Sequence, residues 1–212
     1  FFLINNGSIK GVNSSIFYKY DINKKKFLRK RYNINLSNKV ILYMGRMDIE
    51  KGILDLLDSF KIISDKYKNI ILLLVGRDEM DINNKLQLSY KTIKEKIIYL
   101  NHNNSPHEIY NLADIFCIPS TREGFGNVVI ESSAVELPVV GSDIFGLKSS
   151  LVNELNGLTY KKNEIKDLTE KLIFLIENDD IRKKFGQNGR KFVVQNFNHK
   201  EINFALEDLI FN

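Results

Sequence analysis

Short apolar runs separated by helix-like segments are the feature that most constrains how this 212-residue chain can fold. The clearest runs are residues 40–45, 70–75 and 114–120, and their middles are continuously apolar instead of alternating with polar residues. Continuous runs are typical of strands that are buried on both faces. Between two of them, residues 52–67 have their apolar positions at helical spacing. Strands that alternate with helices predict an α/β fold with a Rossmann-like, doubly wound parallel sheet.

The same patterns set the order of the other expected elements. Ser105, Pro106 and Glu108 predict a helix start with a cap, a proline in the first turn and an acidic third position. Asn198 and Glu201 predict another capped start, which opens a final helix. We also expect strands at 97–100, 138–141 and 158–160, and helices at 82–96, 128–135, 164–177 and 181–196. Ligands of such a sheet bind beyond the carboxyl ends of the strands, so function is expected in the loops that follow them.

Composition excludes several classes of protein. The chain is 43% hydrophobic and 27% charged, which fits a globular domain, and from its sequence we expect neither a transmembrane helix nor a signal peptide. The only cysteine, Cys117, lies in an apolar run, so we expect a buried core residue and a reducing, cytoplasmic compartment. The chain opens at Phe1 inside an apolar run and without an initiator Met, which suggests a fragment of a longer protein.

A basic run supplies much of the formal net charge of +5. It consists of the Lys and Arg residues at positions 24, 25, 26, 29, 30 and 31. One interpretation is attraction to an anionic membrane or to nucleic acid. No nucleic-acid motif or aromatic platform accompanies the run, so no nucleic-acid partner is expected. The favoured interpretation is the solvated face of a helix, with a peripheral membrane contact as the alternative.

Residues 123–131 are the most informative stretch for function, because they pass from a predicted strand through a glycine-containing loop into a helix. The start of a helix presents unpaired N–H groups and the positive end of its dipole, which favour anions. Gly124 and Gly126 allow positive φ and a close approach of a ligand to the backbone. Glu131 is one turn into the helix and its side chain tilts back, so its carboxylate is expected in the crevice of Glu123. This arrangement indicates a ligand with phosphate and hydroxyl groups, such as a nucleotide sugar; a buried structural glutamate is the alternative.

A second loop carries positive charge that such a ligand needs. Arg46 and Lys51 bracket the residues that lead from the strand at 40–45 into the next helix. Arg presents a planar fork to phosphate oxygens and Lys presents a mobile point charge, so together they could neutralise a diphosphate. Taken singly, either could be an ordinary surface charge. We expect this loop to face the same crevice as Glu123.

Other kinds of site are not indicated. There is no Gly-x-Gly-x-x-Gly after the first strand and no Gly-Lys-Ser/Thr loop, which argues against a dehydrogenase or a kinase. The histidines at positions 102, 107 and 199 form no metal-like cluster, and we expect solvated or capping residues. Asp78, Glu79 and Asp81 follow a strand end and are interpreted as a solvated turn. No metal is therefore expected.

With these residues in view, the chain resembles the C-terminal, nucleotide-sugar-binding half of family-4 retaining glycosyltransferases (glycosyl transferases group 1) with the GT-B fold. It looks most like the bacterial enzymes of capsular and lipid-linked glycans. The specific combination is an Arg-x4-Lys pair upstream of a Glu-x7-Glu pair. The matching residues are 6–13, 45–46, 51–52, 74–76, 109–114, 119–120, 123–126, 131, 137–139 and 156–157. Relatives usually carry a glycine within residues 100–103, where this chain has Leu-Asn-His-Asn, so the nucleotide base is not assigned.

The resemblance implies a role for each residue of the two loops. Arg46 and Lys51 would bind the donor diphosphate and, with Glu123, form the catalytic set. Glu123 would face the sugar hydroxyls, and Glu131 would bind the ribose hydroxyls. The whole donor-binding set would be Arg46, Lys51, Glu123, Gly124, Phe125, Gly126, Asn127 and Glu131, with no metal and no further cofactor.

The function that the resemblance implies is transfer of a sugar from a nucleotide donor, most simply a UDP-sugar, to a glycan or lipid-linked acceptor, with retention at the anomeric carbon. Residues 40–197 would be the nucleotide-sugar-binding domain, 1–39 a segment from the interdomain region and 198–212 a C-terminal helix. The acceptor would bind through a missing N-terminal domain, so this part alone would bind donor without turnover, in the cytoplasm at the inner face of the cell membrane. Two alternatives are a nucleotide-sugar-binding module without activity and a hydrolysing nucleotide-sugar epimerase of the same fold.

Overall fold

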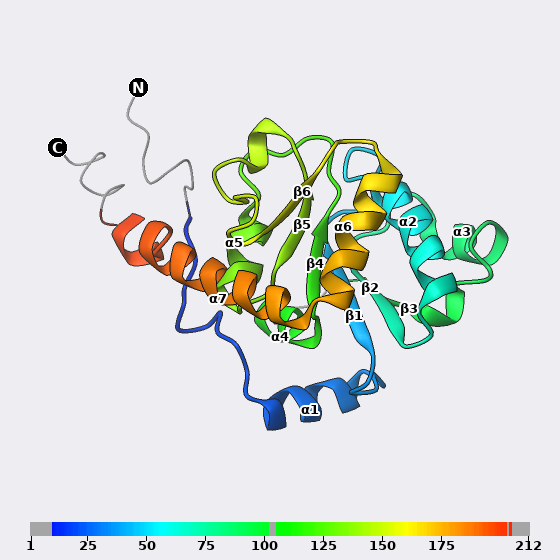
Figure 1. Cartoon of the computed structure of the whole chain (residues 1–212), viewed down its shortest axis with the longest axis horizontal. Coiled ribbons are helices and arrows are strands. Elements are labelled where there is room, and N and C mark those ends of the chain that lie inside the picture. Colours follow the sequence, from blue (N-terminus) through cyan, green and yellow to red (C-terminus); the bar gives the residue numbers. More distant parts are fainter. Residues whose placement is uncertain (1–9, 102–104, 203, 205–212) are drawn as a thin grey trace.

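A six-stranded parallel sheet organises the chain in a computed structural model, which describes residues 10–101, 105–202 and 204. The strand order is β3-β2-β1-β4-β5-β6, and Figure 1 shows helices on both faces of the sheet. The strands are β1 Lys39–Met44, β2 Ile70–Val75, β3 Ile97–Leu100, β4 Ile115–Ile118, β5 Val139–Ser142 and β6 Gly157–Tyr160. Every neighbouring pair is parallel, which confirms the predicted doubly wound sheet.

Helices cover both faces of the sheet, and the side chains of β1 show why the middle of a strand is apolar at consecutive positions. The helices are α1 Ile22–Arg31, α2 Ile53–Lys66, α3 Ile82–Leu88, α4 Pro106–Leu112, α5 Asn127–Ala134, α6 Ile165–Glu177 and α7 Asp179–Asn196, with short 3-10 turns η2 Lys94–Lys96 and η3 Phe145–Leu147. Ile41 and Tyr43 pack with side chains of α2 and α6. Val40 and Leu42 pack with side chains of α1, α4 and α5. Successive side chains of a strand point to opposite faces, so both sets must be apolar.

The helix expected at 82–96 is wrong in its length. α3 ends at Leu88, and the chain turns before η2. Tyr90 folds inward and donates from its hydroxyl to Asp58 of α2 (2.9 Å), while Ile93 is fully buried. These tertiary contacts override the helical spacing of the sequence. A smaller difference is that α7 begins at Asp179 instead of at position 181.

The helix start predicted at Asn198 is present. The side chain of Asn198 accepts from the backbone N–H of Lys200 (3.1 Å) and donates to Glu201 (3.2 Å). Most of the final helix, the apolar run at the first residues and His102 lie outside the described residues. The division of the chain at 39/40 and 197/198 stays a prediction.

The basic run forms α1, but part of the run is buried, which corrects the expectation of a solvated face. Arg29 is 2% exposed, and its guanidinium donates to the carbonyls of Leu112 (2.8 and 3.0 Å) and Asn38 (3.0 Å). Asp114 accepts from Arg29 (2.8 Å) and from Lys25 (2.9 Å) on separate oxygens. Because Asn38 precedes β1 and Asp114 precedes β4, α1 is fixed at the amino ends of the strands (Figure 1).

Two further features bear on the class of protein. Cys117 is fully buried in β4, as predicted for a core residue, and burial raises the pKa of its thiol. Among the described residues, no helix combines the length and the apolar character needed to cross a bilayer.

Candidate functional site

Two loops at the carboxyl ends of neighbouring strands enclose the candidate site. One loop joins β1 to α2 and the other joins β4 to α5, and the two strands pair directly. A cavity of about 450 Å³ lies between the loops. Its charged lining residues are Arg46, Lys51 and Glu123, which the sequence placed in one crevice. The topology therefore brings together segments that are far apart in the chain.

Close backbone contacts join the two walls of this cavity. Gly52 has φ +66°, and a Cβ at this position would come within 2.1 Å of the carbonyl oxygen of Pro119. Only glycine permits both that conformation and that approach. Thr121 donates from its N–H (2.7 Å) and its hydroxyl (3.0 Å) to the carbonyl of Glu50. The loops are thus fastened to each other and not only to their own strands.

An ion pair crosses the cavity from one loop to the other. Nζ of Lys51 is 2.7 Å from Oε1 of Glu123, and the hydroxyl of Ser120 donates to the same oxygen (2.7 Å). Both side chains are largely buried. Within the described part of the chain, Oε2 of Glu123 makes no hydrogen bond to the protein, so it can accept from a ligand. Ser120 is among the residues that carry the family resemblance, but the sequence assigned it no role, although its position three residues before Glu123 places it within reach.

Arg46 lines the same cavity but is much more accessible, with 52% of its side chain exposed. Its Nε is 2.8 Å from Oδ2 of Asp48, and its Nη1 is 3.7 Å from Glu79. Oδ1 of Asp48 accepts from the backbone N–H of Lys51 (2.9 Å). Asp48 therefore contacts both predicted phosphate-binding residues. Sequence reasoning missed it, and its place between the two was the available signal.

The loop before α5 presents mainly backbone to the cavity. Gly126 is the N-cap with φ +78°, and a glycine side chain cannot cap the first-turn N–H groups. Gly124 does not have positive φ, and a Cβ there would meet nothing within 4 Å, which corrects the expectation for that residue. The ring of Phe125 packs against Phe197 (5.4 Å between centroids). Asn127 is the exposed first residue of the helix.

Glu131 lies one turn into α5 and does not line this cavity, which differs from the expected shared crevice. The hydroxyl of Tyr110, a fully buried residue, donates to Oε2 of Glu131 (3.0 Å). Burial raises the pKa of the Glu131 carboxyl, while the Tyr110 hydrogen bond and the charge of Lys10 act in the opposite direction. Burial also raises the pKa of Tyr110. The carboxylate is thus held by a partner that the sequence did not reveal.

The acidic turn after β2 is structural. Asp78 accepts from the N–H groups of Met80 (3.0 Å) and Ile82 (2.7 Å), which stabilises the entry to α3. The neighbouring Glu79 lies beside Arg46, so the turn is not simply solvated. Among residues 10–101, 105–202 and 204, no group of three or more His, Cys, Asp or Glu side chains is arranged to hold a metal ion.

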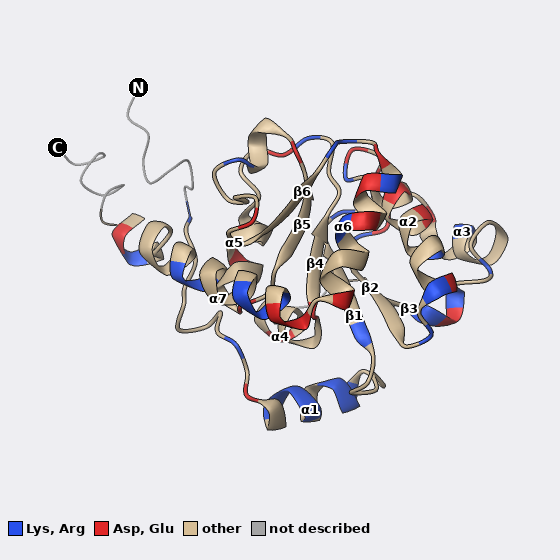
Figure 2. Cartoon of the chain, in the orientation of Figure 1, with Lys and Arg blue, Asp and Glu red and all other residues tan. Residues whose placement is uncertain are grey.

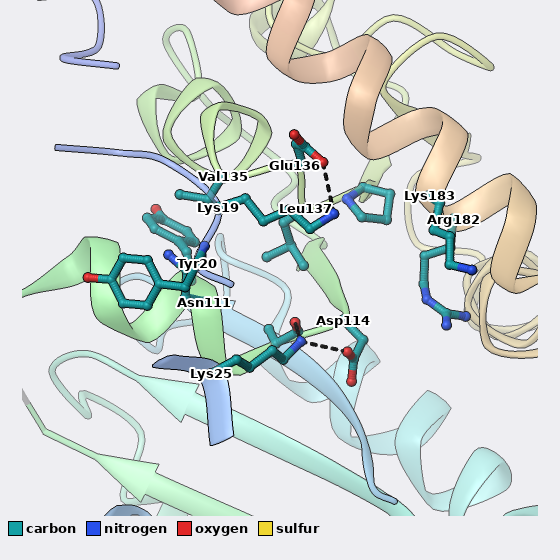
Figure 3. A pocket seen from close by; sticks show the side chains of 13 residues that line it. Lys19, Tyr20, Lys25, Asn111, Asp114, Val135, Glu136, Leu137, Arg182 and Lys183 are labelled. Atoms are coloured by element: carbon teal, nitrogen blue, oxygen red, sulfur yellow. Dashed lines mark hydrogen bonds and ion pairs between the residues drawn. The ribbon is translucent and has the colours of Figure 1, made fainter. Parts of the chain in front are cut away.

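A second cavity, of about 180 Å³, lies at the amino ends of the strands (Figure 3). Its charges are matched within the protein: Lys19 pairs with Glu136 and Lys25 with Asp114, each at 2.9 Å. Arg182 is buried and donates to backbone carbonyls of α6. This smaller cavity joins structural elements, and the larger one at the carboxyl ends is the candidate site.

Comparison with known proteins identifies the family. Residues 24–192 match the family described as glycosyl transferases group 1, and the chain belongs to this family. It is 34% identical over 206 residues to the capsular polysaccharide biosynthesis glycosyltransferase CapM of Staphylococcus aureus. The aligned region covers 96% of this chain and 53% of CapM. The chain spans about half the length of the curated relatives it matches.

Solved structures agree on the fold. HepE of Anabaena, solved in complex with UDP and glucose, superimposes with a TM-score of 0.84 at 19% identity over 95% of this chain and 55% of HepE. The C-terminal domain of LpcC, a glycosyl transferase group 1 family protein of Francisella tularensis, gives a TM-score of 0.80 at 22% identity over 89% of this chain and 99% of that domain. The Rossmann-like sheet is thus that of a GT-B glycosyltransferase half, as the resemblance implied.

Proposed function

We propose that this chain is the donor-binding half of a glycosyltransferase that takes a sugar from a nucleoside diphosphate sugar, most simply a UDP-sugar, with retention at the anomeric carbon. The observation that carries the proposal is the Lys51–Glu123 ion pair across a cavity that Arg46 and the start of α5 also line. Family membership supports the class of reaction, and HepE, which was solved with UDP, supports the choice of base.

Stabilisation of the leaving diphosphate is the chemical task of the positive groups. Negative charge on the diphosphate increases as the bond to the sugar breaks, and fixed positive groups lower the energy of that state. Arg46 offers its accessible guanidinium edge and Lys51 its ammonium group. The uncapped first turn of α5 adds backbone N–H donors and the positive end of the helix dipole. We therefore propose that the diphosphate is bound without a divalent metal.

The two carboxylates divide the remaining contacts of the donor. Glu123 has Oε2 available beside Lys51, which suits the hydroxyls of the transferred sugar. Glu131 lies further along α5 and is held by Tyr110, which suits the two ribose hydroxyls. In this proposal Lys51 is shared between Glu123 and the diphosphate when the donor is bound.

The acceptor and the location extend the same proposal. CapM acts in capsular polysaccharide biosynthesis, which supports a glycan or lipid-linked acceptor for this protein, bound by an N-terminal domain outside this chain. A cytoplasmic location with a peripheral contact to the inner face of the membrane fits such an acceptor. Family membership and the basic helix α1 support this acceptor and this location, and the cavity at the carboxyl ends bears on neither.

Calorimetric titration tests the donor assignment directly. The 212-residue chain would be titrated with UDP, GDP and ADP, with the corresponding glucose donors and with inorganic diphosphate, once in chelator and once in magnesium. We expect one nucleoside diphosphate to bind in chelator, and its sugar conjugate to bind at least as tightly. Absence of binding by every nucleotide to a chain that circular dichroism shows to be folded would overturn the donor role. Binding only in magnesium would overturn the metal-free diphosphate site alone.

A further inference from the structure

Positive charge and exposed apolar side chains are concentrated in the same short segment. Between positions 16 and 39 the chain has eight of its 31 Lys and Arg residues but only one of its 26 Asp and Glu residues, so the rest of the chain is slightly acidic. The segment also holds five of the twelve large hydrophobic side chains that are exposed in the described part: Ile16, Tyr18, Ile22, Phe27 and Leu36. Figure 2 shows the positive residues along α1.

The helical stripe Asn23, Lys26, Phe27 and Lys30, which we call the α1 face, points to solvent. Lys26 and Phe27 each lie three or four positions from both Asn23 and Lys30, and all four residues are exposed, Phe27 by 68%. The opposite side of the helix is buried through residues 28 and 29. In the part of the chain that the structure describes, neither Lys26 nor Lys30 makes an ion pair. The α1 face is therefore rigidly presented without contributing to the anchoring of the helix.

A fixed surface of this composition matches a partner that is both anionic and apolar. Exposure of the Phe27 ring to water is unfavourable, and burial of the ring in an apolar partner would remove that cost. A purely polar anion could pair with the lysines but would not bury the ring. The headgroup region of a bilayer offers phosphate groups at the surface and acyl chains directly beneath. Lysine side chains can keep their charges at the phosphates while their stems and a neighbouring aromatic ring lie deeper.

We propose that the α1 face docks on a bilayer that contains anionic phospholipid, with Phe27 at the boundary between headgroups and acyl chains and with Lys26 and Lys30 at the phosphates. This inference rests on the membrane contact of the proposed function, to which it assigns a surface. It does not depend on the donor chemistry, so nucleotide binding and vesicle binding can fail separately.

A single tryptophan gives the most direct test, because the chain has none of its own. Phe27→Trp would be mixed with phosphatidylglycerol–phosphatidylcholine vesicles and with pure phosphatidylcholine vesicles at low salt. We expect a blue shift of the emission and quenching by brominated acyl chains with the anionic vesicles only. The matched control is Leu88→Trp on α3, where the side chain is 74% exposed and Lys91 and Lys94 are nearby and exposed. Emission of Phe27→Trp that stays unchanged, or that shifts no more than that of the control, would overturn the insertion.

The contribution of the lysines is tested by sedimentation with the same vesicles. The double variant Lys26→Gln and Lys30→Gln is expected to partition roughly 30-fold less onto anionic vesicles, which corresponds to about 1 kcal/mol for each basic residue near the surface. The control Lys91→Gln and Lys94→Gln should partition like the unaltered chain. Equal losses in the two double variants would show general charge attraction and not docking by the α1 face. No partition of the unaltered chain at low salt would exclude a membrane as the partner, in favour of an acidic protein or none.

Discussion

The two ends of the parallel sheet carry the same kinds of charged residue in opposite settings. At the amino ends, the guanidinium of Arg29 is buried and donates to backbone carbonyls and to the carboxylate of Asp114. At the carboxyl ends, Arg46 is half exposed and its Nε faces Asp48. The first arrangement is saturated by the protein, while the second leaves most of the guanidinium for a ligand. Accessibility and saturation, and not residue type, separate the structural cation from the candidate functional one.

Energetics sharpen this comparison. Removing one partner of a buried ion pair leaves an uncompensated charge and costs about 3–5 kcal/mol of stability. An exposed ion pair contributes about 0–1 kcal/mol. Arg29 should therefore matter mainly for unfolding and Arg46 mainly for binding, so substitutions of these two residues should separate the properties.

Arg29→Ala should give the largest effect, a loss of about 3–5 kcal/mol in the free energy of unfolding, because Asp114 would stay buried beside only one cation. Urea denaturation followed by circular dichroism measures it. The matched change Arg46→Ala should cost less than about 1 kcal/mol. Similar losses for the two variants would remove the distinction between the ends.

Arg46→Ala and Lys51→Ala should each weaken binding of the nucleoside diphosphate and of the complete donor about ten- to hundredfold. A charge-assisted phosphate contact contributes roughly 1.5–3 kcal/mol, and both ligands carry the same diphosphate. Calorimetry measures both affinities. Arg77→Ala is the control, since Arg77 is 81% exposed on the neighbouring loop and lies outside the cavity. Unchanged diphosphate affinity in both site variants would refute the assignment.

Glu123→Gln and Glu131→Gln should affect different parts of the donor. Glu131→Gln should lower the affinity for the nucleoside diphosphate about tenfold, because a carboxylate accepts from two ribose hydroxyls better than an amide does. Glu123→Gln should leave the affinity for the nucleoside diphosphate unchanged and lower only the affinity for the complete donor, by a similar factor. Equal losses of the nucleoside diphosphate in the two variants would contradict this division of roles.

The smallest effect is expected from Glu131→Gln on stability. The pKa of this carboxyl is raised in the folded state, mainly by burial, so protonation favours folding and ionisation opposes it. The variant should be slightly more stable than the unaltered chain at pH 7, within about 1 kcal/mol. This gain should fade as the pH falls through the folded pKa and be absent below the unfolded value of about 4.3. A clear loss of stability at pH 7 would indicate a structural role for the ionised carboxylate.

The strands could be predicted because burial on both faces leaves a local mark, the continuous apolar run. The end of α3 has no such local signal in the sequence, because the contact of Tyr90 with Asp58 joins residues that are 32 positions apart. The buried role of Arg29 was hidden for the same reason: its partners are distant in sequence, and the surrounding run contains five other cations.

The candidate site was predictable where the topology alone decides. Lys51 and Glu123 follow neighbouring parallel strands, so their loops had to meet. Asp48, Ser120 and Tyr110 were not predictable in their roles, because a polar residue in a loop or helix looks the same in sequence whether it holds a functional side chain or faces water. For Glu131 the sequence spacing was misleading. The spacing placed its carboxylate in the cavity beside Glu123, but Glu131 lies one turn into α5 and does not line that cavity.

The parallel direction of the strands also fixes a distance. The α1 face lies at the amino ends of β1 and β4, and the cavity of the candidate site lies at their carboxyl ends. A strand of six residues such as β1 spans about 20 Å. A protein resting on a bilayer through the α1 face would hold its donor sugar at least that far above the lipid headgroups. At this distance from the membrane, the protein would select acceptors by their length. It would extend a lipid-linked glycan that already carries several sugars, and it would not reach a lipid that carries only one.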